Sequence, residues 1–221
     1  MVFSVAIDGP AGAGKSTAAK ELSKMLGAIY LDTGAMYRTV ALAAIKRGID
    51  TQDGEALEKM IEEIDIDVRF GENGQEIYLD GENVNGLIRT PEVSLGASRV
   101  AVFPPVRHKM VEKQREIAYK NNVVMDGRDI GTYVLKDAKY KFFLVASVEI
   151  RAKRRYKELI AKGMEADMES IIEDIKFRDK NDSSRAMAPL KQAEDAILID
   201  TTNQSIQEMV DDMAGYITDV S

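Results

Sequence analysis

The chain of 221 residues contains no cysteine and no tryptophan, and it has one histidine, His108. Without cysteine it cannot form a disulfide framework, a thiolate zinc site or a thiol nucleophile. A single histidine also excludes any mechanism that needs a histidine pair. No apolar run approaches the roughly 20 residues of a membrane-spanning helix. The amino terminus lacks the basic and apolar segments of a signal peptide. We therefore expect a soluble, cytoplasmic protein.

Acidic side chains are concentrated in one part of the sequence. Residues 50–85 include twelve acidic side chains and two basic ones, whereas the whole chain has a formal net charge of −7. The remainder is therefore mildly basic, which suits a compact anionic substrate better than a long polyanion. The length fits one domain that carries a small insert.

Short apolar runs alternate with segments whose apolar residues recur at helical spacing. Strands are predicted at residues 3–7, 28–31, 122–125, 140–146 and 196–199. Helices are predicted at residues 18–26, 35–47, 55–64, 104–120, 148–162 and 168–178, and from residues 91 and 205 onward. Alternation of this kind is typical of an α/β fold with a doubly wound, parallel sheet of five strands.

The acidic segment interrupts this alternation. Residues 65–70 and 75–79 alternate between apolar and polar side chains, and turn-forming residues occur at 71–74 and 80–81. Strands joined in this way form an antiparallel meander. We expect a core of residues 1–50 and 99–221, with a short helical lid at about 151–185. Residues 51–98 are expected to form a small antiparallel β insert.

A complete phosphate-binding motif follows the first predicted strand. It has the pattern G-x-x-x-x-G-K-S from Gly9 to Ser16 and precedes a predicted helix. Its backbone N–H groups can converge on phosphate oxygens, Lys15 can reach the β- and γ-phosphates of ATP, and the Ser16 hydroxyl can bind Mg²⁺. The candidate ATP-binding residues are Gly9, Pro10, Ala11, Gly12, Ala13, Gly14, Lys15, Ser16 and Thr17.

Other polar residues follow the predicted strands at the edge where such sheets bind ligands. Asp126 ends a strand and is either a second Mg²⁺ ligand or an ordinary turn former. Arg128 and Asp129 come directly after it, and Tyr37 and Arg38 follow the second strand. Arginines gathered at one edge would neutralise the charge of a transferring phosphoryl group.

Six sequence blocks together resemble the bacterial cytidylate (CMP/dCMP) kinase family, which belongs to the nucleoside monophosphate kinases. The blocks are residues 9–17, 31–38 (LDTGAMYR), 98–101, 106–107, 126–132 (DGRDIGT) and 182–190. The resemblance runs nearly from end to end and includes the meander, which is similar to that family's insert in its monophosphate-binding region. It implies ATP-dependent phosphorylation of CMP and dCMP, with Mg²⁺ bound together with ATP. From the charge and the short apolar runs we expect no nucleic-acid or membrane partner, and a monomer is adequate for this chemistry.

The resemblance also assigns roles to individual positions. It implies recognition of the base by Ser98, Arg107 and Asp129, and of the acceptor phosphate by Arg38 and Arg128. It places the ribose against Thr33, Asp182 and Arg185, with Tyr37 also in the substrate site. The catalytic candidates are Lys15, Arg128, Arg178 and Arg185, to which the lid adds Arg154 or Arg155. Cytosine fits the first set because a carboxylate can accept from N4 while an arginine donates to N3 or O2.

Two other functions remain open at this point. A kinase of a small metabolite, such as shikimate or gluconate, could have the same fold, and a nucleotide-sensing or nucleic-acid-binding ATPase could have the same loop. The basic run at residues 151–157 is bracketed by acidic residues and has no row of aromatic side chains. We interpret it as a solvated helix face near the ATP site.

Overall fold

The computed structural model describes residues 2–72 and 74–218. Five strands form one parallel sheet in the order β2-β6-β1-β7-β8. Their bounds are β1 (Ser4–Asp8), β2 (Ile29–Asp32), β6 (Val123–Gly127), β7 (Tyr140–Val145) and β8 (Ile197–Asp200). This confirms the predicted α/β fold with five parallel strands.

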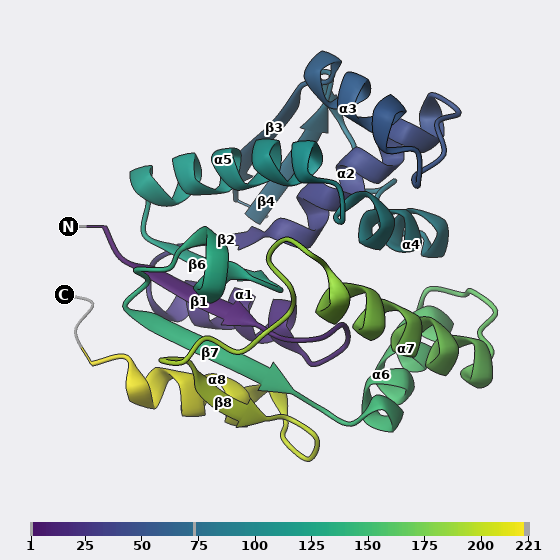
Figure 1. The fold of residues 1–221 in the computed structure, drawn as a ribbon. Helices are drawn as coiled ribbons and strands as arrows, with labels where there is room; N and C mark the ends of the chain where they lie inside the picture. Colours follow the sequence, from purple (N-terminus) through teal and green to yellow (C-terminus); the bar gives the residue numbers. More distant parts are fainter. Residues whose placement is uncertain (1, 73, 219–221) are drawn as a thin grey trace.

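Helices cover both faces of the sheet (Figure 1). They are α1 (Lys15–Met25), α2 (Thr33–Lys46), α3 (Gly54–Glu63), α4 (Pro91–Val100), α5 (Pro104–Lys120), α6 (Val148–Ala161), α7 (Met168–Ser184) and α8 (Ile206–Tyr216). Alternate side chains of one strand enter different cores: Val5 and Ile7 pack in a cluster with residues of α1 and α8, whereas Ala6 belongs to the cluster of α2 and α5. Burial on both faces explains why the strands are continuous apolar runs.

Local signals start several helices where the sequence predicts them. Thr90 caps α4 through its side chain, and Pro91 occupies the first helical position. Ser205 and Glu208 form the predicted capping box at the start of α8. These contacts satisfy backbone N–H groups that have no partner within the helix.

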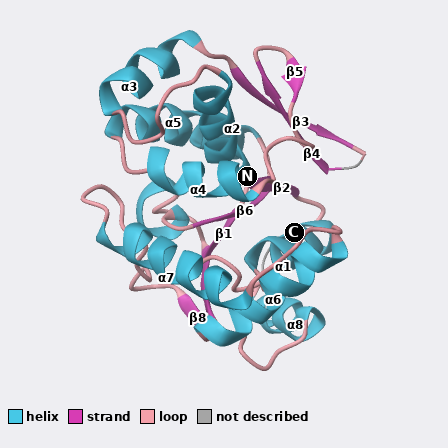
Figure 2. Cartoon of the chain, turned by 90° about the vertical axis from the view of Figure 1, so that its right-hand side faces the viewer, coloured by secondary structure: helices cyan, strands magenta, loops and turns pink. Residues whose placement is uncertain are grey.

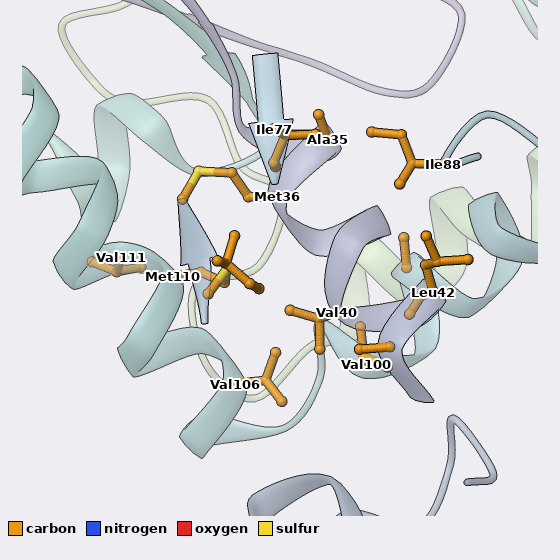
Figure 3. Packing of buried hydrophobic residues seen from close by; sticks show 14 of the residues in the cluster. Ala35, Met36, Val40, Leu42, Ile77, Ile88, Val100, Val106, Met110 and Val111 are labelled. Carbon is orange, nitrogen blue, oxygen red and sulfur yellow. The ribbon is translucent and has the colours of Figure 1, made fainter. Parts of the chain in front are cut away.

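The acidic segment contains a separate antiparallel sheet of β3 (Ile66–Gly71), β4 (Gly74–Leu79) and β5 (Glu82–Asn83), as its alternation predicts. Of the predicted turn at 71–74, Asn73 lies outside the described residues. Figure 2 shows these strands on the side of the molecule opposite α8. The described residues of this sheet share the main core, because Ile77 of β4 packs in one cluster with residues of α2, α4 and α5 (Figure 3).

This shared core predicts cooperative unfolding. Ile77 is fully buried, so we expect Ile77→Ala to lower the free energy of unfolding by about 2–4 kcal/mol. Because the meander and the main sheet pack on the same side chains, urea should unfold both in one transition. Circular dichroism measures this transition. The exposed Glu58→Ala serves as control. A separate early transition in the Ile77→Ala variant would contradict the shared core.

Two elements differ from the sequence prediction. Helix α7 continues to Ser184, so the polar stretch from Arg178 onward is helical instead of following a helix. A single π-helical turn, η1 (Ile130–Val134), follows β6 and had no sequence signal. In the described part of the chain, no helix combines the length and the apolar character needed to cross a bilayer.

Candidate active site

The phosphate loop connects β1 to α1 at the carboxyl edge of the sheet, and α6 and α7 lie beyond this edge (Figure 1). Gly9 has φ of 144°, and a Cβ atom there would lie 2.1 Å from the carbonyl oxygen of Leu144. Gly12 has φ of 78°, and its Cβ would lie 3.0 Å from the Cβ of Arg151. Only glycine allows the loop to approach β7 and α6 so closely.

Lys15 begins α1 and is 5% exposed. Its ammonium group donates a hydrogen bond of 2.8 Å to the carbonyl of Pro10, which folds the side chain over the loop. Burial, reinforced by the positive charge of Arg128, lowers the pKa of Lys15 to about 7. A phosphate anion at the loop would relieve this unfavourable burial of positive charge.

Three side chains meet at Asp126, the fourth residue of β6. Ser16 Oγ donates to its Oδ2 at 2.8 Å, and the Tyr30 hydroxyl donates to its Oδ1 at 2.8 Å. Thr33 Oγ1 donates to its backbone carbonyl at 2.7 Å. Burial and the neighbouring charge of Asp32 raise the pKa of Asp126. The predicted pair of Ser16 and Asp126 is therefore brought together.

The oxygen atoms of this pair fit Mg²⁺. That ion prefers oxygen ligands and is usually held by one or two protein groups together with water and substrate phosphates. Among residues 2–72 and 74–218, no group of three or more histidine, aspartate or glutamate side chains is arranged as a complete metal site. A metal that enters with a nucleotide suits this donor set better than one bound by protein alone.

Arg107 and Asp129 form a buried ion pair between α5 and the start of η1. Arg107 is 0% exposed, its Nη1 donates to the carbonyl of Ala101 at 3.3 Å, and its guanidinium carbon lies 5.8 Å from the centre of the Tyr37 ring. Burial raises the pKa of Asp129, although Arg107 and Arg185 oppose the shift. The contact with Arg107 uses Oδ2 of Asp129.

Ser98 has a different neighbour. The side-chain amide of Asn181 donates to Ser98 Oγ at 3.1 Å and to its carbonyl at 2.7 Å. These bonds join α4 to α7. The structure therefore pairs two of the three predicted base-recognition residues directly and links the third to the helix that carries Arg178. Asn181 had no role in the sequence prediction.

Three of the predicted arginines, Arg128, Arg178 and Arg185, gather around Asp182 of α7. Arg128 Nε donates to its Oδ2 at 2.8 Å, and Arg185 Nε donates to its carbonyl at 3.2 Å. Burial raises the pKa of Asp182, but these arginines outweigh that effect and hold the pKa below its ordinary value. Arg178 Nε and Arg185 Nη2 are buried and have no hydrogen-bond partner among the described residues. Burial and the charge of Arg128 lower the pKa of Arg178 to about 10, so this cluster is suited to an anion.

Arg38 pairs with a residue that the sequence analysis did not select. Its Nη2 donates to Asp32 Oδ2 at 2.8 Å, and Arg89 approaches the same oxygen at 3.4 Å. Burial opposes ionisation of Asp32, but the two arginines hold its pKa below the ordinary value. Arg38 Nε remains buried without a hydrogen-bond partner among the described residues.

The interpretation of residues 151–157 as a solvated face is wrong for Arg151. This side chain is 4% exposed, binds both carboxylate oxygens of Asp179 at 3.0 and 2.6 Å, and donates to the carbonyl of Ala11 at 3.1 Å. Arg154 donates to the carbonyl of Thr201 at 2.6 Å. Because bidentate pairing with a carboxylate satisfies a buried guanidinium, Arg151 holds α6, α7 and the phosphate loop together.

Asp8, the last residue of β1, is a further contact that sequence reasoning missed. Its Oδ1 accepts from the backbone N–H of Ile130 at 2.8 Å, and its Oδ2 accepts from that of Gly131 at 2.7 Å. Burial raises its pKa to about 7, although these N–H donors oppose the shift. One carboxylate thereby fixes the turn after Asp129 to the strand that begins the phosphate loop.

A phosphate loop between β1 and α1, with buried arginines at the same edge of a five-stranded parallel sheet, defines the molecule as a P-loop kinase. Residues 5–219 match the model of the cytidylate kinase family. The chain is 49% identical over 218 residues to the cytidylate kinases of Bacillus thuringiensis (strain Al Hakam) and Bacillus cereus (strain AH187), which covers 99% of this chain and 97% of each relative. The chain belongs to the cytidylate kinase family.

Solved structures show the fold at much lower sequence identity. An uncharacterized protein from Eubacterium ventriosum matches with a TM-score of 0.52 at 14% identity, covering 98% of both chains. A gluconokinase from Sinorhizobium meliloti matches with a TM-score of 0.50 at 12% identity, covering 96% of this chain and 90% of that one. These likenesses support the fold alone. Because the chain belongs to the cytidylate kinase family, the alternative of a small-metabolite kinase is not favoured.

Proposed function

We propose that this chain transfers the γ-phosphoryl group of ATP to CMP and dCMP through the residues described above. The carrying observation is that a complete phosphate loop shares its sheet edge with the buried pair of Arg107 and Asp129, in a chain of the cytidylate kinase family. A kinase whose phosphoryl acceptor has no base to recognise would have no use for a buried pair of a hydrogen-bond donor and a hydrogen-bond acceptor.

On the donor side, ATP binds the loop from Gly9 to Thr17, with Lys15 on its β- and γ-phosphates. Ser16 and Asp126 would hold Mg²⁺, which neutralises phosphate charge when it is bound. Of the two lid helices, α7 supplies Arg178 toward the phosphates. Arg154, which donates to Thr201, would contact the nucleotide from the side of β8.

On the acceptor side, Oδ1 of Asp129 accepts from the N4 amino group of cytosine. Arg107 donates to N3 or O2, and its buried Nε has no partner among the described residues. Ser98 completes this edge of the base. Uracil presents an oxygen at position 4, which would face the carboxylate and leave both groups unpaired. Such buried mismatches discriminate strongly between substrates.

The ribose lies against Thr33, Asp182 and Arg185, with Tyr37 beside the base, and the acceptor phosphate binds Arg38 and Arg128. An oxygen of this phosphate forms a bond to the γ-phosphorus while the bond from that phosphorus to the bridging oxygen breaks, and ADP leaves with the electron pair. The attacking phosphate is already ionised, so no strong general base is required. Positioning and charge neutralisation by Lys15, Arg128, Arg178 and Arg185 supply the rate.

Closure of the lid at about residues 151–185 would exclude water, which otherwise accepts the phosphoryl group. We further propose that residues 51–98 act as the acceptor-side insert on a core of residues 1–50 and 99–221.

A monomer is adequate for this reaction, because every residue assigned to it comes from one chain. ATP and CMP are metabolites of the cytoplasm, where we place the reaction.

A coupled assay of ADP formation with ATP, Mg²⁺ and a panel of acceptors tests the proposal. We expect CMP and dCMP to be phosphorylated with kcat/KM at least about a hundredfold above those of UMP, AMP, shikimate and gluconate. Thermal stabilisation by CMP, measured without ATP, provides an independent readout of acceptor binding. Equal or better turnover of UMP or AMP would contradict the base assignment.

A further inference from the structure

Gln75, at the second position of β4, reaches from the insert to the core. Its Oε1 accepts from the backbone N–H of Asp32 at 2.7 Å, and its Nε2 donates to the backbone carbonyl of Asp32 at 3.3 Å. Strand β2 is at the edge of the five-stranded sheet, so this side of Asp32 has no strand beside it in that sheet. The Gln75 amide satisfies both groups as a neighbouring strand would.

Asp32 transmits this contact to the acceptor site. Its Oδ1 accepts from the backbone N–H of Ala35 at 2.8 Å and thereby caps α2. Its Oδ2 binds Arg38 at 2.8 Å. The same short residue therefore has its backbone held by the insert and its carboxylate bound to the arginine that we assign to the acceptor phosphate.

Gln75 is itself held in place within the insert. Asn85 donates from Nδ2 to the carbonyl of Gln75 at 3.1 Å and accepts at Oδ1 from the N–H of Ile77 at 2.9 Å. Gln75 and Asp32 both line a cavity of about 790 Å³ between α1 and the meander. Because open space lies beside these two residues, the contact between Gln75 and Asp32 depends on hydrogen bonding and not on tight packing.

We propose that Gln75 is a positioning residue for the acceptor phosphate, because it fixes Asp32 and, through Asp32, the guanidinium of Arg38. The proposal rests on the function proposed above, in which Arg38 binds the phosphate of CMP. The insert then has two roles, since it borders the acceptor site and also orients one of that site's arginines.

The matched variants are Gln75→Met and Gln52→Met. Methionine keeps the length of the side chain and removes both hydrogen bonds, while Gln52 is an exposed glutamine at the start of the insert and serves as control. We expect Gln75→Met to raise KM for CMP about tenfold, because Arg38 is then no longer held in position for the phosphate. KM for ATP and kcat should change less than about twofold, because no donor-side residue is altered.

Amide hydrogen exchange at Asp32 gives a readout that does not depend on activity. In Gln75→Met this amide should exchange at least about tenfold faster, with Gln52→Met unchanged. The proposal is overturned if Asp32 exchange stays at the wild-type rate, if KM for CMP is unaltered, or if KM for CMP and for ATP rise equally. Should the wild-type chain fail to phosphorylate CMP, the proposed function fails, and the exchange measurement still decides whether Gln75 holds Asp32.

Discussion

Replacing Asp129 by asparagine is expected to lower kcat/KM for CMP by roughly a thousandfold. Asp129 is 5% exposed and carries the negative charge that faces Arg107, which is fully buried. A site built to hydrogen-bond one group of its substrate loses a factor of about 10⁴–10⁵ when that bond cannot form, and asparagine, which keeps one acceptor oxygen, is expected to lose a smaller part of this, about 4 kcal/mol or a thousandfold in rate. The substitution keeps the shape of the side chain, so the loss reports on charge and on hydrogen bonding.

The orientation of the new amide follows from Arg107. Because the guanidinium only donates, the oxygen of the introduced amide must turn toward it. The amide nitrogen then occupies the position of Oδ1 and places its own N–H groups against the N4 amino group of cytosine. Two donors facing each other repel CMP, whereas the O4 atom of uracil could accept from this nitrogen. We therefore expect the preference for CMP over UMP to shrink together with the activity.

Steady-state kinetics with CMP and UMP check this result. KM for ATP should stay within about twofold of the wild-type value, since we assign Asp129 to the acceptor side. Asp137→Asn, an exposed change a few residues further along, is the matched control. An Asp129→Asn enzyme that kept its selectivity for CMP, or that lost ATP and CMP affinity equally, would show that this pair does not recognise the base.

Elements whose signal lies within a few neighbouring residues could be predicted from the sequence. Helix α5 (Pro104–Lys120) has the predicted bounds, because a proline pair starts it and the apolar spacing persists to its end. The alternation in β3 and β4 separated the antiparallel insert from the parallel sheet. The continuation of α7 to Ser184 was missed, since polar residues favour a loop locally, whereas in the folded chain Asp182 binds Arg128 and Asn181 binds Ser98.

The motifs indicated candidate residues of the site, but they did not indicate which contacts these residues make. The pairing of Ser16 with Asp126, 110 residues apart, follows from the strand order of a parallel sheet. Asp8, Gln75 and Arg151 have roles that depend on contacts with residues distant in sequence, at separations of 122, 43 and 28 residues. No local pattern distinguishes a buried, paired arginine from a solvated one, so these contacts could be found only in the folded chain.

Replacing Lys15 by methionine is expected to lower kcat about a thousandfold while making the ligand-free protein more stable. The lost rate reflects removal of a preorganised positive charge from the β- and γ-phosphates, where single donors contribute factors of about 10²–10³. The gain in stability has a different origin. In the absence of nucleotide the ammonium is buried, and methionine fills the same space without a charge.

The pH dependence separates these two effects. Burial lowers the pKa of Lys15 from 10.5 to about 7, so between these values the unfolded chain binds more protons than the folded one, and wild-type stability rises with pH. The penalty of the buried charge is complete below pH 7 and disappears as the pH approaches 10.5. Urea denaturation should therefore show Lys15→Met to be more stable than wild type at about pH 6.5, with the difference narrowing toward about pH 10. If the variant is less stable than wild type at the lower pH, the neighbouring acidic residues already compensate Lys15 in the free enzyme. Its positive charge is then not left uncompensated until phosphate binds.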